Sequence, residues 1–293
     1  MQRISFIKYH GAGNDFILID NRTLSHSWND PSFIRRVCHR HHGIGADGVI
    51  LLDFSSLAHY RMRIFNADAS EAAMCGNGIR CLCLLIRRLG DLRPEWTIET
   101  PAGILKCSIE GDGISVNLGT PKVLYWPIEF EESKLFVVDT GVPHAVLFVD
   151  HLEQVAAAEV GRKIRFHSLF APQGVNVNFV TVKAPNQLII RTYERGVEAE
   201  TMACGTGAAA SAFVSAQLLG FTSPVIVHPF SAQGHESMQF RFPSSMSGSC
   251  EIEMIGRASE VFEGTICCSG VGFSVGKIRG SPYNGSVVTK VSS

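Results

Sequence analysis

The sequence lacks any uninterrupted apolar run of about 18 residues, so no membrane-spanning helix is expected. It also has almost no net charge, with 26 basic against 27 acidic residues. Without a broad positive field, binding to nucleic acid or to an anionic membrane is disfavoured as its main role. The opening segment, residues 1–9, lacks the long apolar core of a signal peptide. We therefore expect a cytoplasmic protein.

The composition is that of a folded, two-domain protein. At about 150 residues per domain, 293 residues suggest two domains. The apolar fraction is 45%, which is enough to bury a large core and makes disorder unlikely. Nine cysteines are an odd number. Without an export signal, free thiols are expected rather than a disulfide framework.

Short β-rich runs separated by Gly, Pro or Asn recur along the chain. They lie at residues 5–9, 16–20, 60–65, 96–100, 113–118, 135–139, 145–149, 178–182, 188–193 and 225–228. Residues 78–89 and 207–219 predict buried helices that stop at Gly90 and Gly220. Residues 31–40 and 151–161 predict surface helices. Many strands and few helices favour an α+β fold over alternating βαβ units.

An internal repeat indicates the domain organisation. The segment Ser70-Glu-Ala-Ala-Met-Cys-Gly-Asn-Gly-Ile matches Ala199-Glu-Thr-Met-Ala-Cys-Gly-Thr-Gly-Ala at one constant offset. A strand precedes each copy and an apolar helix follows it. We predict an N-terminal domain over residues 1–120 and a C-terminal domain over residues 121–257, each carrying one cysteine motif.

Each repeat places a cysteine, Cys75 or Cys204, where a helix begins. A helix N-terminus carries roughly half a positive elementary charge and several unpaired N–H donors. This field favours thiolate over thiol, and adjacent glycines let backbone N–H groups hold a carboxylate. A single such turn is as well explained by tight packing of a small apolar cysteine. Two copies, one per domain, favour a chemical role.

Two thiols on opposite sides of a cleft suit a reaction that inverts a stereocentre. One thiolate removes a proton from one face of Cα, and the other thiol delivers a proton to the opposite face. The alternative is a thiol redox protein with a reversible Cys75–Cys204 disulfide. Redox pairs favour Cys-x-x-Cys spacing, and neither cysteine has another three residues away.

Four ordered motifs resemble the diaminopimelate epimerase family. They are His10-Gly-Ala-Gly-Asn-Asp-Phe, Phe65-Asn-Ala-Asp-Ala-Ser-Glu-Ala-Ala-Met-Cys-Gly-Asn-Gly-Ile-Arg-Cys, Gly141-Val-Pro-His and Tyr193-Glu-Arg-Gly-Val-Glu-Ala-Glu-Thr-Met-Ala-Cys-Gly-Thr-Gly. The resemblance extends to about Gly264, and the tail over residues 273–293 has no assigned role. The two cysteine motifs resemble this family more than its proline racemase relatives.

The resemblance implies an isomerase that interconverts LL- and meso-diaminopimelate for lysine and peptidoglycan synthesis, without pyridoxal phosphate (PLP) or metal. It implies two pseudo-symmetric domains, each a strand-rich, barrel-like sheet around a central helix. A returning strand over about residues 258–272 would join the first domain. The implied partner is the amino-acid substrate, without nucleic acid or membrane, and a homodimer is possible.

The resemblance also assigns site residues. Cys75 and Cys204 would be the acid/base pair, with His144 assisting Cys75 and Glu194 supporting Cys204. Backbone N–H groups of the two cysteine turns would hold the α-carboxylate, and the remaining side chains would contact the two ends of the substrate. The carboxylate-binding residues are Gly76, Asn77, Gly205 and Thr206, the reacting end contacts Asn14 and Glu194, and the distal end contacts Asn66, Asn176 and Arg195.

Two further motifs have ordinary explanations. The loop Gly11-Ala-Gly13 is followed by a strand-like run, whereas a dinucleotide-binding loop requires a helix there. The cluster Cys38-His39-Arg-His41-His42 fits no zinc spacing, so the polar end of a helix is the better interpretation. The other cysteines are expected to be inert.

Several positions depart from the family pattern and bear on selectivity. Gly48 stands where many members have Gln, Val142 where many have Asn, and Ala69 where Gly is frequent. The segment from Glu194 to Cys204 is one residue longer than the common form. Losing two polar contacts leaves open a racemase of broader specificity, acting for example on glutamate. A non-catalytic relative is disfavoured because both thiols are present.

Overall fold

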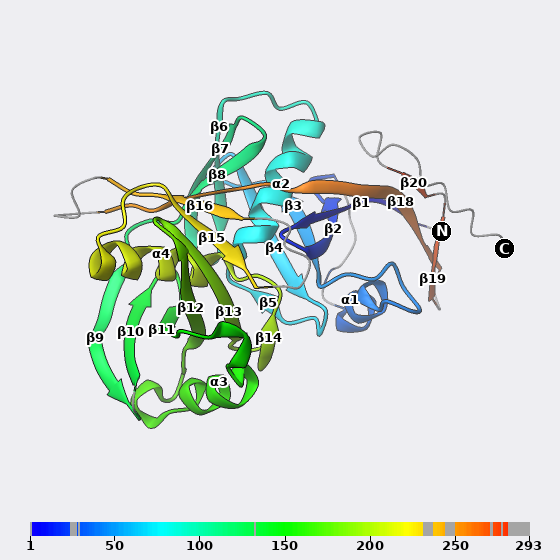
Figure 1. Cartoon of the computed structure of the whole chain (residues 1–293). Coiled ribbons are helices and arrows are strands. Elements are labelled where there is room, and N and C mark those ends of the chain that lie inside the picture. The colour runs from blue at the N-terminus through cyan, green and yellow to red at the C-terminus, as the bar shows by residue number, and fades with distance from the viewer. Residues whose placement is uncertain are drawn as a thin grey trace. The chain divides into compact units, whose positions relative to one another are not determined.

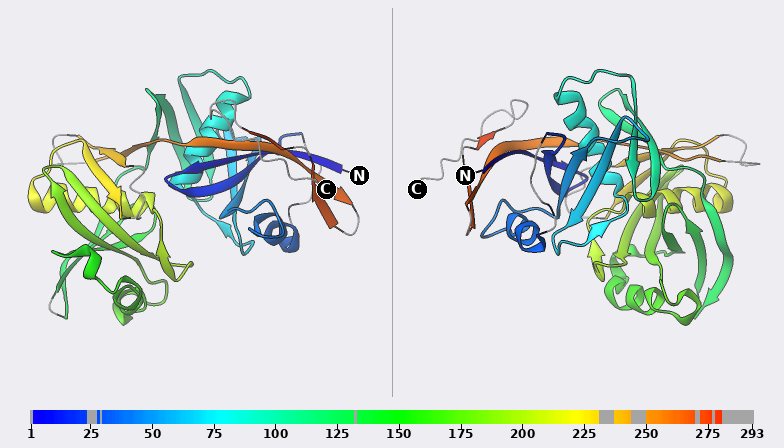
Figure 2. Two further views of the ribbon diagram at one scale, coloured as in Figure 1. Left: turned by 45° about the vertical axis from the view of Figure 1, so that its right-hand side comes forward. Right: turned by 180° about the vertical axis from the view of Figure 1, so that it is seen from behind.

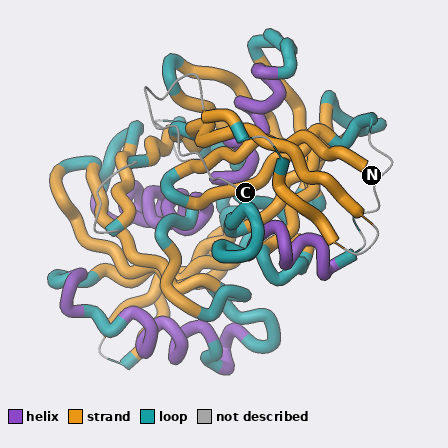
Figure 3. The backbone as a smooth tube through the Cα atoms, turned by 90° about the vertical axis from the view of Figure 1, so that its right-hand side faces the viewer, coloured by secondary structure: helices purple, strands orange, loops and turns teal. Residues whose placement is uncertain are grey.

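The computed structural model describes residues 2–23, 28, 30–131, 133–230, 237–243, 250–269, 272–276 and 278–280. Most of the tail, residues 281–293, lies outside this part of the chain. The chain forms two compact units, residues 1–108 with 258–293, and residues 109–257. The predicted boundary after residue 120 stays a prediction. In both units strands predominate and helices are few (Figure 3).

The first unit is a mostly antiparallel sheet with two parallel pairings. Its strand order is β18–β1–β2–β3–β4–β6–β7, in which β2–β3 and β4–β6 are parallel. The long strand β18 runs beside β1 (Figure 2) and also pairs with β19 and β20. The strands are β1 (Gln2–Gly11), β2 (Asn14–Asp20), β3 (Gly48–Asp53), β4 (Tyr60–Asn66), β5 (Glu71–Ala72), β6 (Glu95–Thr100), β7 (Gly103–Glu110, which ends in the second unit), β18 (Ser259–Ser269), β19 (Gly272–Val275) and β20 (Arg279–Gly280).

The second unit repeats this pattern. Its order is β9–β10–β11–β12–β13–β15–β16–β17–β8, in which β11–β12 and β13–β15 are parallel. The short strands β5 and β14 pair with β4 and β13 in turn. The strands are β8 (Gly113–Asn117), β9 (Lys122–Phe130), β10 (Ser133–Asp139), β11 (Pro143–Phe148), β12 (Asn176–Ala184), β13 (Gln187–Glu194), β14 (Ala199–Thr201), β15 (Val225–Pro229), β16 (Met238–Arg241) and β17 (Glu253–Gly256).

Each unit has a buried helix against its sheet (Figure 1). Helix α2 (Gly76–Arg88) packs on β1 to β4, and α4 (Gly205–Leu219) packs on β10 to β13, β15 and β16. The first eleven residues of α4, apart from Thr206, are buried on every side. Its small side chains, including Ala208 to Ala210, let strands approach closely from several directions. The predicted strand-rich α+β fold of two similar halves is confirmed.

The predicted helix ends mostly agree with the structure. Gly220 ends α4 with the left-handed φ of 68°. Helix α1 (Pro31–Cys38) begins at Asp30, whose side chain accepts from the Ser32 N–H. The opposite faces of the sheets are covered by α1 in the first unit and α3 (Ala157–Arg165) in the second.

The predicted helix over residues 151–161 is wrong at both ends. A 3₁₀ turn at Leu152–Gln154 precedes α3, and Val155 between them has extended backbone. Gly161 lies inside the helix rather than ending it. A Cβ at Gly161 would lie 2.5 Å from the Cβ of Tyr193, so this glycine lets the helix pack closely on β13. A second 3₁₀ turn follows at Ser168–Phe170.

Candidate active site

Cys75 caps the N-terminus of α2. Its backbone is extended, with φ of −142°, and its sulfur accepts from the Gly78 N–H at 3.4 Å. A Cβ at Gly78 would lie 2.8 Å from the Ile50 side chain, so this turn packs tightly against β3. The sulfur therefore lies among the first N–H groups of the helix, where the helix dipole favours a thiolate.

A polar network fixes the surroundings of Cys75. Asn14 Oδ1 lies 3.7 Å from Cys75 Sγ and accepts from Asn77 Nδ2 at 3.3 Å. Asn14 Nδ2 donates to Asp47 Oδ2 at 2.8 Å, which sets the orientation of the amide. The predicted residues Cys75, Asn14 and Asn77 are thus brought together. Asp47 was not predicted, because nothing in the sequence places it beside Asn14.

Arg80 is a second residue that the sequence analysis missed. It is fully buried, and it donates to Gly76 O at 3.0 Å and to Asn77 Oδ1 at 2.9 Å. Its guanidinium braces the first turn of α2 from the inside. An arginine within an otherwise apolar helical run was the signal that could have identified it, because a buried cation requires specific partners.

Cys204 occupies the N-cap position of α4 in the second unit and is only 7% exposed. Its sulfur lies 3.6 Å from Thr206 Oγ1. The Thr206 carbonyl accepts from Thr140 Oγ1 at 2.8 Å. The predicted carboxylate-binding residues Gly205 and Thr206 form the first turn of α4, as Gly76 and Asn77 do in α2.

A buried histidine continues the network from Cys204. His144 Nε2 lies 2.9 Å from Thr206 Oγ1, and its Nδ1 lies 3.2 Å from Asn178 Nδ2. Burial, reinforced by the Arg195 charge, lowers the pKa of His144 to about 3, so the ring is neutral. Because an amide N–H₂ can only donate, Nδ1 accepts and Nε2–H donates to Thr206. The Thr206 hydroxyl proton is then free to point toward the Cys204 sulfur.

In the structure, His144 therefore contacts Thr206 of the Cys204 motif. Its predicted assistance to Cys75 stays a prediction. Glu194 accepts from Thr201 Oγ1 at 2.7 Å, on the segment that leads to Cys204. Burial raises the pKa of Glu194 above its usual value, against the opposing effect of the Thr201 hydrogen bond.

Asn176 and Arg195 lie together in the second unit. The Asn176 side chain accepts from the Arg195 N–H at 2.8 Å and donates to Pro143 O at 3.4 Å. The Arg195 guanidinium donates to Gly174 O at 3.4 Å. In the first unit, Asn66 is exposed where β4 ends, and its side chain donates to Ser70 Oγ at 3.0 Å.

The positions that depart from the family pattern have local structural consequences. A Cβ at Gly48 would lie 2.5 Å from the Phe65 carbonyl oxygen, so the backbone at this position leaves no room for a side chain. Ala69 has a φ of 73°, and Glu198, in the lengthened segment, has a φ of 57°. Both non-glycine residues are in the left-handed region that favours glycine. Val142 is half-buried.

Other classes of site find no support in the described residues. No group of three or more His, Cys, Asp or Glu side chains in these ranges could hold a metal ion. His39 Nδ1 instead accepts from the N–H groups of His41 and His42, both at 3.1 Å, at the end of α1. Within the same ranges, no helix combines the length and apolarity needed to cross a membrane. None of the nine cysteines, all of which lie in these ranges, forms a disulfide bond.

Solved structures with similar folds belong to several proteins. A phenazine biosynthesis protein of the PhzF family from Bacillus anthracis matches with a TM-score of 0.71 and 17% identity, over 92% of this chain and all of that one. A hydroxyproline epimerase from Agrobacterium vitis matches with a TM-score of 0.65 and 17% identity, over 90% of this chain and 91% of that one. At this identity the likeness shows the fold alone, and it agrees with the two-domain fold described above.

Sequence comparisons identify the family. The diaminopimelate epimerase family model matches residues 6–124 and 136–231. The diaminopimelate epimerase of Archaeoglobus fulgidus is 42% identical over 75% of this chain and 84% of its own length. The enzyme of the same name from Aquifex aeolicus is 36% identical over 90% of this chain and 98% of its own length. The family predicted from the motifs is therefore confirmed: the chain belongs to the diaminopimelate epimerase family.

Proposed function

We propose that this protein converts LL-2,6-diaminopimelate to meso-diaminopimelate by a two-thiol acid/base reaction, in lysine and peptidoglycan synthesis. The curated relatives named above carry this activity in their names. The predicted enzyme class, an isomerase acting on amino acids, is confirmed. The observation that carries the mechanism is the duplication: in each unit, a cysteine that is not in a disulfide occupies the N-cap position of the buried helix.

The proton balance needs only these two side chains. In one direction the Cys75 thiolate takes the Cα proton and becomes a thiol. The Cys204 thiol delivers its proton to the opposite face of Cα and becomes a thiolate. The substrate leaves with inverted configuration, and the two sulfurs have exchanged protonation states. The reverse reaction, or proton exchange with water, restores the starting state.

The first helical turns would stabilise the charge that develops during this transfer. Backbone N–H groups of Gly76 and Asn77, and of Gly205 and Thr206, would bind the α-carboxylate as negative charge spreads onto it. Asn14 would contact the reacting end from beside Cys75, which it meets at 3.7 Å. Glu194 would contact the same end of the substrate from beside the Cys204 motif.

The neutral His144 has a positioning role in this proposal. A histidine with a pKa of about 3 is neutral near neutral pH, so it has no imidazolium proton to give to the substrate or to a thiolate. It orients the Thr206 hydroxyl toward Cys204, so a hydrogen bond is available to the sulfur when it becomes a thiolate. At the distal end of the substrate, Arg195 would bind the second carboxylate with its planar guanidinium, beside Asn176 and Asn66.

The second candidate is a racemase of broader specificity on the same scaffold. It is favoured by Gly48, where the backbone leaves no room for a side chain, and by Val142, which offers no hydrogen bond. Apolar pockets discriminate less strongly than pockets built to hydrogen-bond their substrate. The expectation of no PLP and no metal, the cytoplasmic location and the homodimer remain predictions.

Steady-state assays with purified protein test the proposal. The wild type is expected to convert LL- to meso-diaminopimelate, and to keep this activity after dialysis against EDTA and hydroxylamine. Cys75→Ser and Cys204→Ser should each lose turnover while keeping the wild-type circular dichroism spectrum. A folded serine variant with near-normal turnover would contradict the two-thiol mechanism. A reversible Cys75–Cys204 disulfide that transfers electrons to a partner, without epimerisation, would favour the redox alternative.

A further inference from the structure

Each of the two cysteines is preceded in the sequence by an arginine and a glutamate that form an ion pair. In the first unit, Arg63 Nε and Nη2 meet the two Glu71 oxygens at 2.8 and 3.1 Å. In the second, Arg191 Nε and Nη2 meet the two Glu200 oxygens at 2.7 Å each. Both contacts are two-pronged, the strongest geometry for an arginine–carboxylate pair. We call them the two hairpin ion pairs.

The two hairpin ion pairs occupy equivalent positions in the repeated fold. Across the antiparallel strands, Glu71 faces Phe65 and Glu200 faces Tyr193. In each case the arginine lies two residues earlier on the longer strand. It therefore projects on the same face as the glutamate and is its diagonal neighbour. Each glutamate is four residues before its cysteine.

The hairpin ion pairs secure segments with little other sheet structure. Strand β5 has two residues and β14 has three, so few backbone hydrogen bonds hold them to β4 and β13. The arginines are themselves fixed to the body of each unit. The Arg63 guanidinium lies 4.9 Å from the Phe65 ring centre, and Arg191 Nη1 donates to the carbonyls of Leu152 and Val155, both at 2.9 Å.

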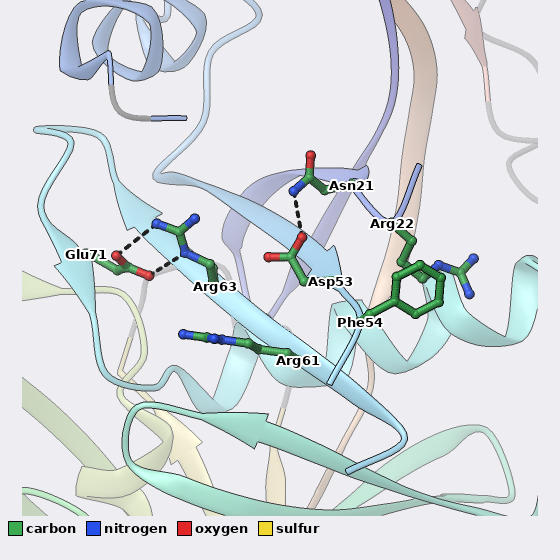
Figure 4. A pocket seen from close by; sticks show the side chains of 7 residues that line it. All are labelled: Asn21, Arg22, Asp53, Phe54, Arg61, Arg63 and Glu71. Atoms are coloured by element: carbon green, nitrogen blue, oxygen red, sulfur yellow. Dashed lines mark hydrogen bonds and ion pairs between the residues drawn. The ribbon is translucent and has the colours of Figure 1, made fainter. Parts of the chain in front are cut away.

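Both hairpin ion pairs are partly exposed to solvent. Figure 4 shows the Arg63 guanidinium facing the Glu71 carboxylate at one side of a pocket of about 480 Å³. Glu71 meets no other labelled side chain there. The Arg63 and Glu71 side chains are 25% and 37% exposed, and those of Arg191 and Glu200 are 14% and 35% exposed. Water would therefore replace a broken pair, and the short strand would lose this side-chain contact to its neighbour.

We propose that Arg63–Glu71 and Arg191–Glu200 are positioning residues that fix where each catalytic thiol lies. This inference rests on the proposed function of Cys75 and Cys204. Proton transfer to and from carbon requires accurate placement, and a displacement of about 1 Å can cost about a hundredfold in rate.

The test uses Glu71→Gln and Glu200→Gln in the full chain. Each is expected to lower kcat for epimerisation by about tenfold or more, with KM changed less than kcat. The second readout is the rate at which iodoacetamide alkylates each cysteine, followed by peptide mass spectrometry. Glu71→Gln should change the rate at Cys75 at least threefold and leave Cys204 unchanged. Glu200→Gln should do the reverse.

Two control variants break ion pairs that do not involve the hairpin strands β5 and β14. Asp20→Asn breaks the two-pronged contact of Arg22 with Asp20, at 2.7 and 2.8 Å and with 23% and 31% exposure, in the first unit. Glu110→Gln breaks the contact with Arg241 in the second. Both controls should keep wild-type kcat and alkylation rates.

Two results would overturn the positioning role. One is a kcat within twofold of wild type in both hairpin variants. The other is an equal change at both cysteines, which would indicate general loosening of the fold. The alkylation readout needs no turnover. A wild type without epimerase activity would therefore refute the proposed function while leaving the positioning role to be decided by the alkylation rates.

Discussion

Because burial lowers the pKa of His144, we expect the stability of the protein to depend on pH in a specific way. Its pKa is about 3 in the folded protein and 6.5 in the unfolded chain. As the pH falls below 6.5, the unfolded chain binds a proton that the folded state does not accept. Stability is therefore complete above pH 6.5 and is lost progressively as the pH falls toward 3.

The size of the effect follows from these two values. Each pH unit below 6.5 costs about 1.4 kcal/mol, because the unfolded chain is protonated there and the folded state is not. Only the part of the interval from pH 7 to pH 5 that lies below 6.5 contributes, so the free energy of unfolding falls by about 2 kcal/mol. Other groups also titrate in this range, and Glu194 acts in the opposite direction because its pKa is raised. A comparison with His144→Gln cancels these contributions, since the amide has no proton to gain.

Urea unfolding at pH 7 and pH 5, followed by tryptophan fluorescence, measures the difference. The wild type should lose about 2 kcal/mol more than His144→Gln between the two pH values. The variant is expected to be less stable at pH 7, because Asn178 and Thr206 lose their shared partner, but this offset does not affect the comparison. An equal pH dependence in both proteins would refute the neutral, buried His144 and the hydrogen-bond direction assigned to Thr206.

Three further predictions concern strain and selectivity. Ala69→Gly should raise the melting temperature, with a gain of up to about 1 kcal/mol, because φ is 73° at this residue; a lower melting temperature by circular dichroism would contradict a strained turn. The wild type should racemise glutamate detectably, and Val142→Asn should raise the kcat/KM ratio of diaminopimelate over glutamate by about tenfold; no glutamate racemisation in the wild type would end the relaxed-pocket interpretation. Arg195→Lys should lower kcat/KM about tenfold for both substrates, because lysine lacks the planar fork; an unchanged value for both would exclude Arg195 from carboxylate binding.

The sequence predicted the elements that carry strong local signals. The helices begun by Cys75 and Cys204 and ended near Gly90 and Gly220 were visible as repeated turns followed by apolar runs. Strands such as β3 (Gly48–Asp53) and β9 (Lys122–Phe130) were missed. β3 is an unbroken apolar run that follows a glycine-rich segment, and β9 is an edge strand with no alternating pattern.

The candidate site was predictable only where residues belong to a motif. The cysteine turns are contiguous in sequence, so their placement at two helix starts followed directly. Asp47 and Arg191 act through partners that the fold brings from other strands, and no local pattern reveals such pairs. The helix predicted over residues 151–161 continues past Gly161 to Arg165, because this glycine makes room for Tyr193 and no local pattern shows that contact.

The most direct test of the central claim is the fate of deuterium during early turnover in D₂O. With LL-diaminopimelate as substrate, the account predicts that newly formed meso product carries deuterium at the inverted Cα while the remaining substrate stays protonated. This follows because the thiol that donates is not the thiolate that accepted. Cys75→Ser and Cys204→Ser should form no deuterated product. Product that retains the substrate's own proton, or rapid washing of deuterium into unreacted substrate alone, would contradict the two-thiol mechanism.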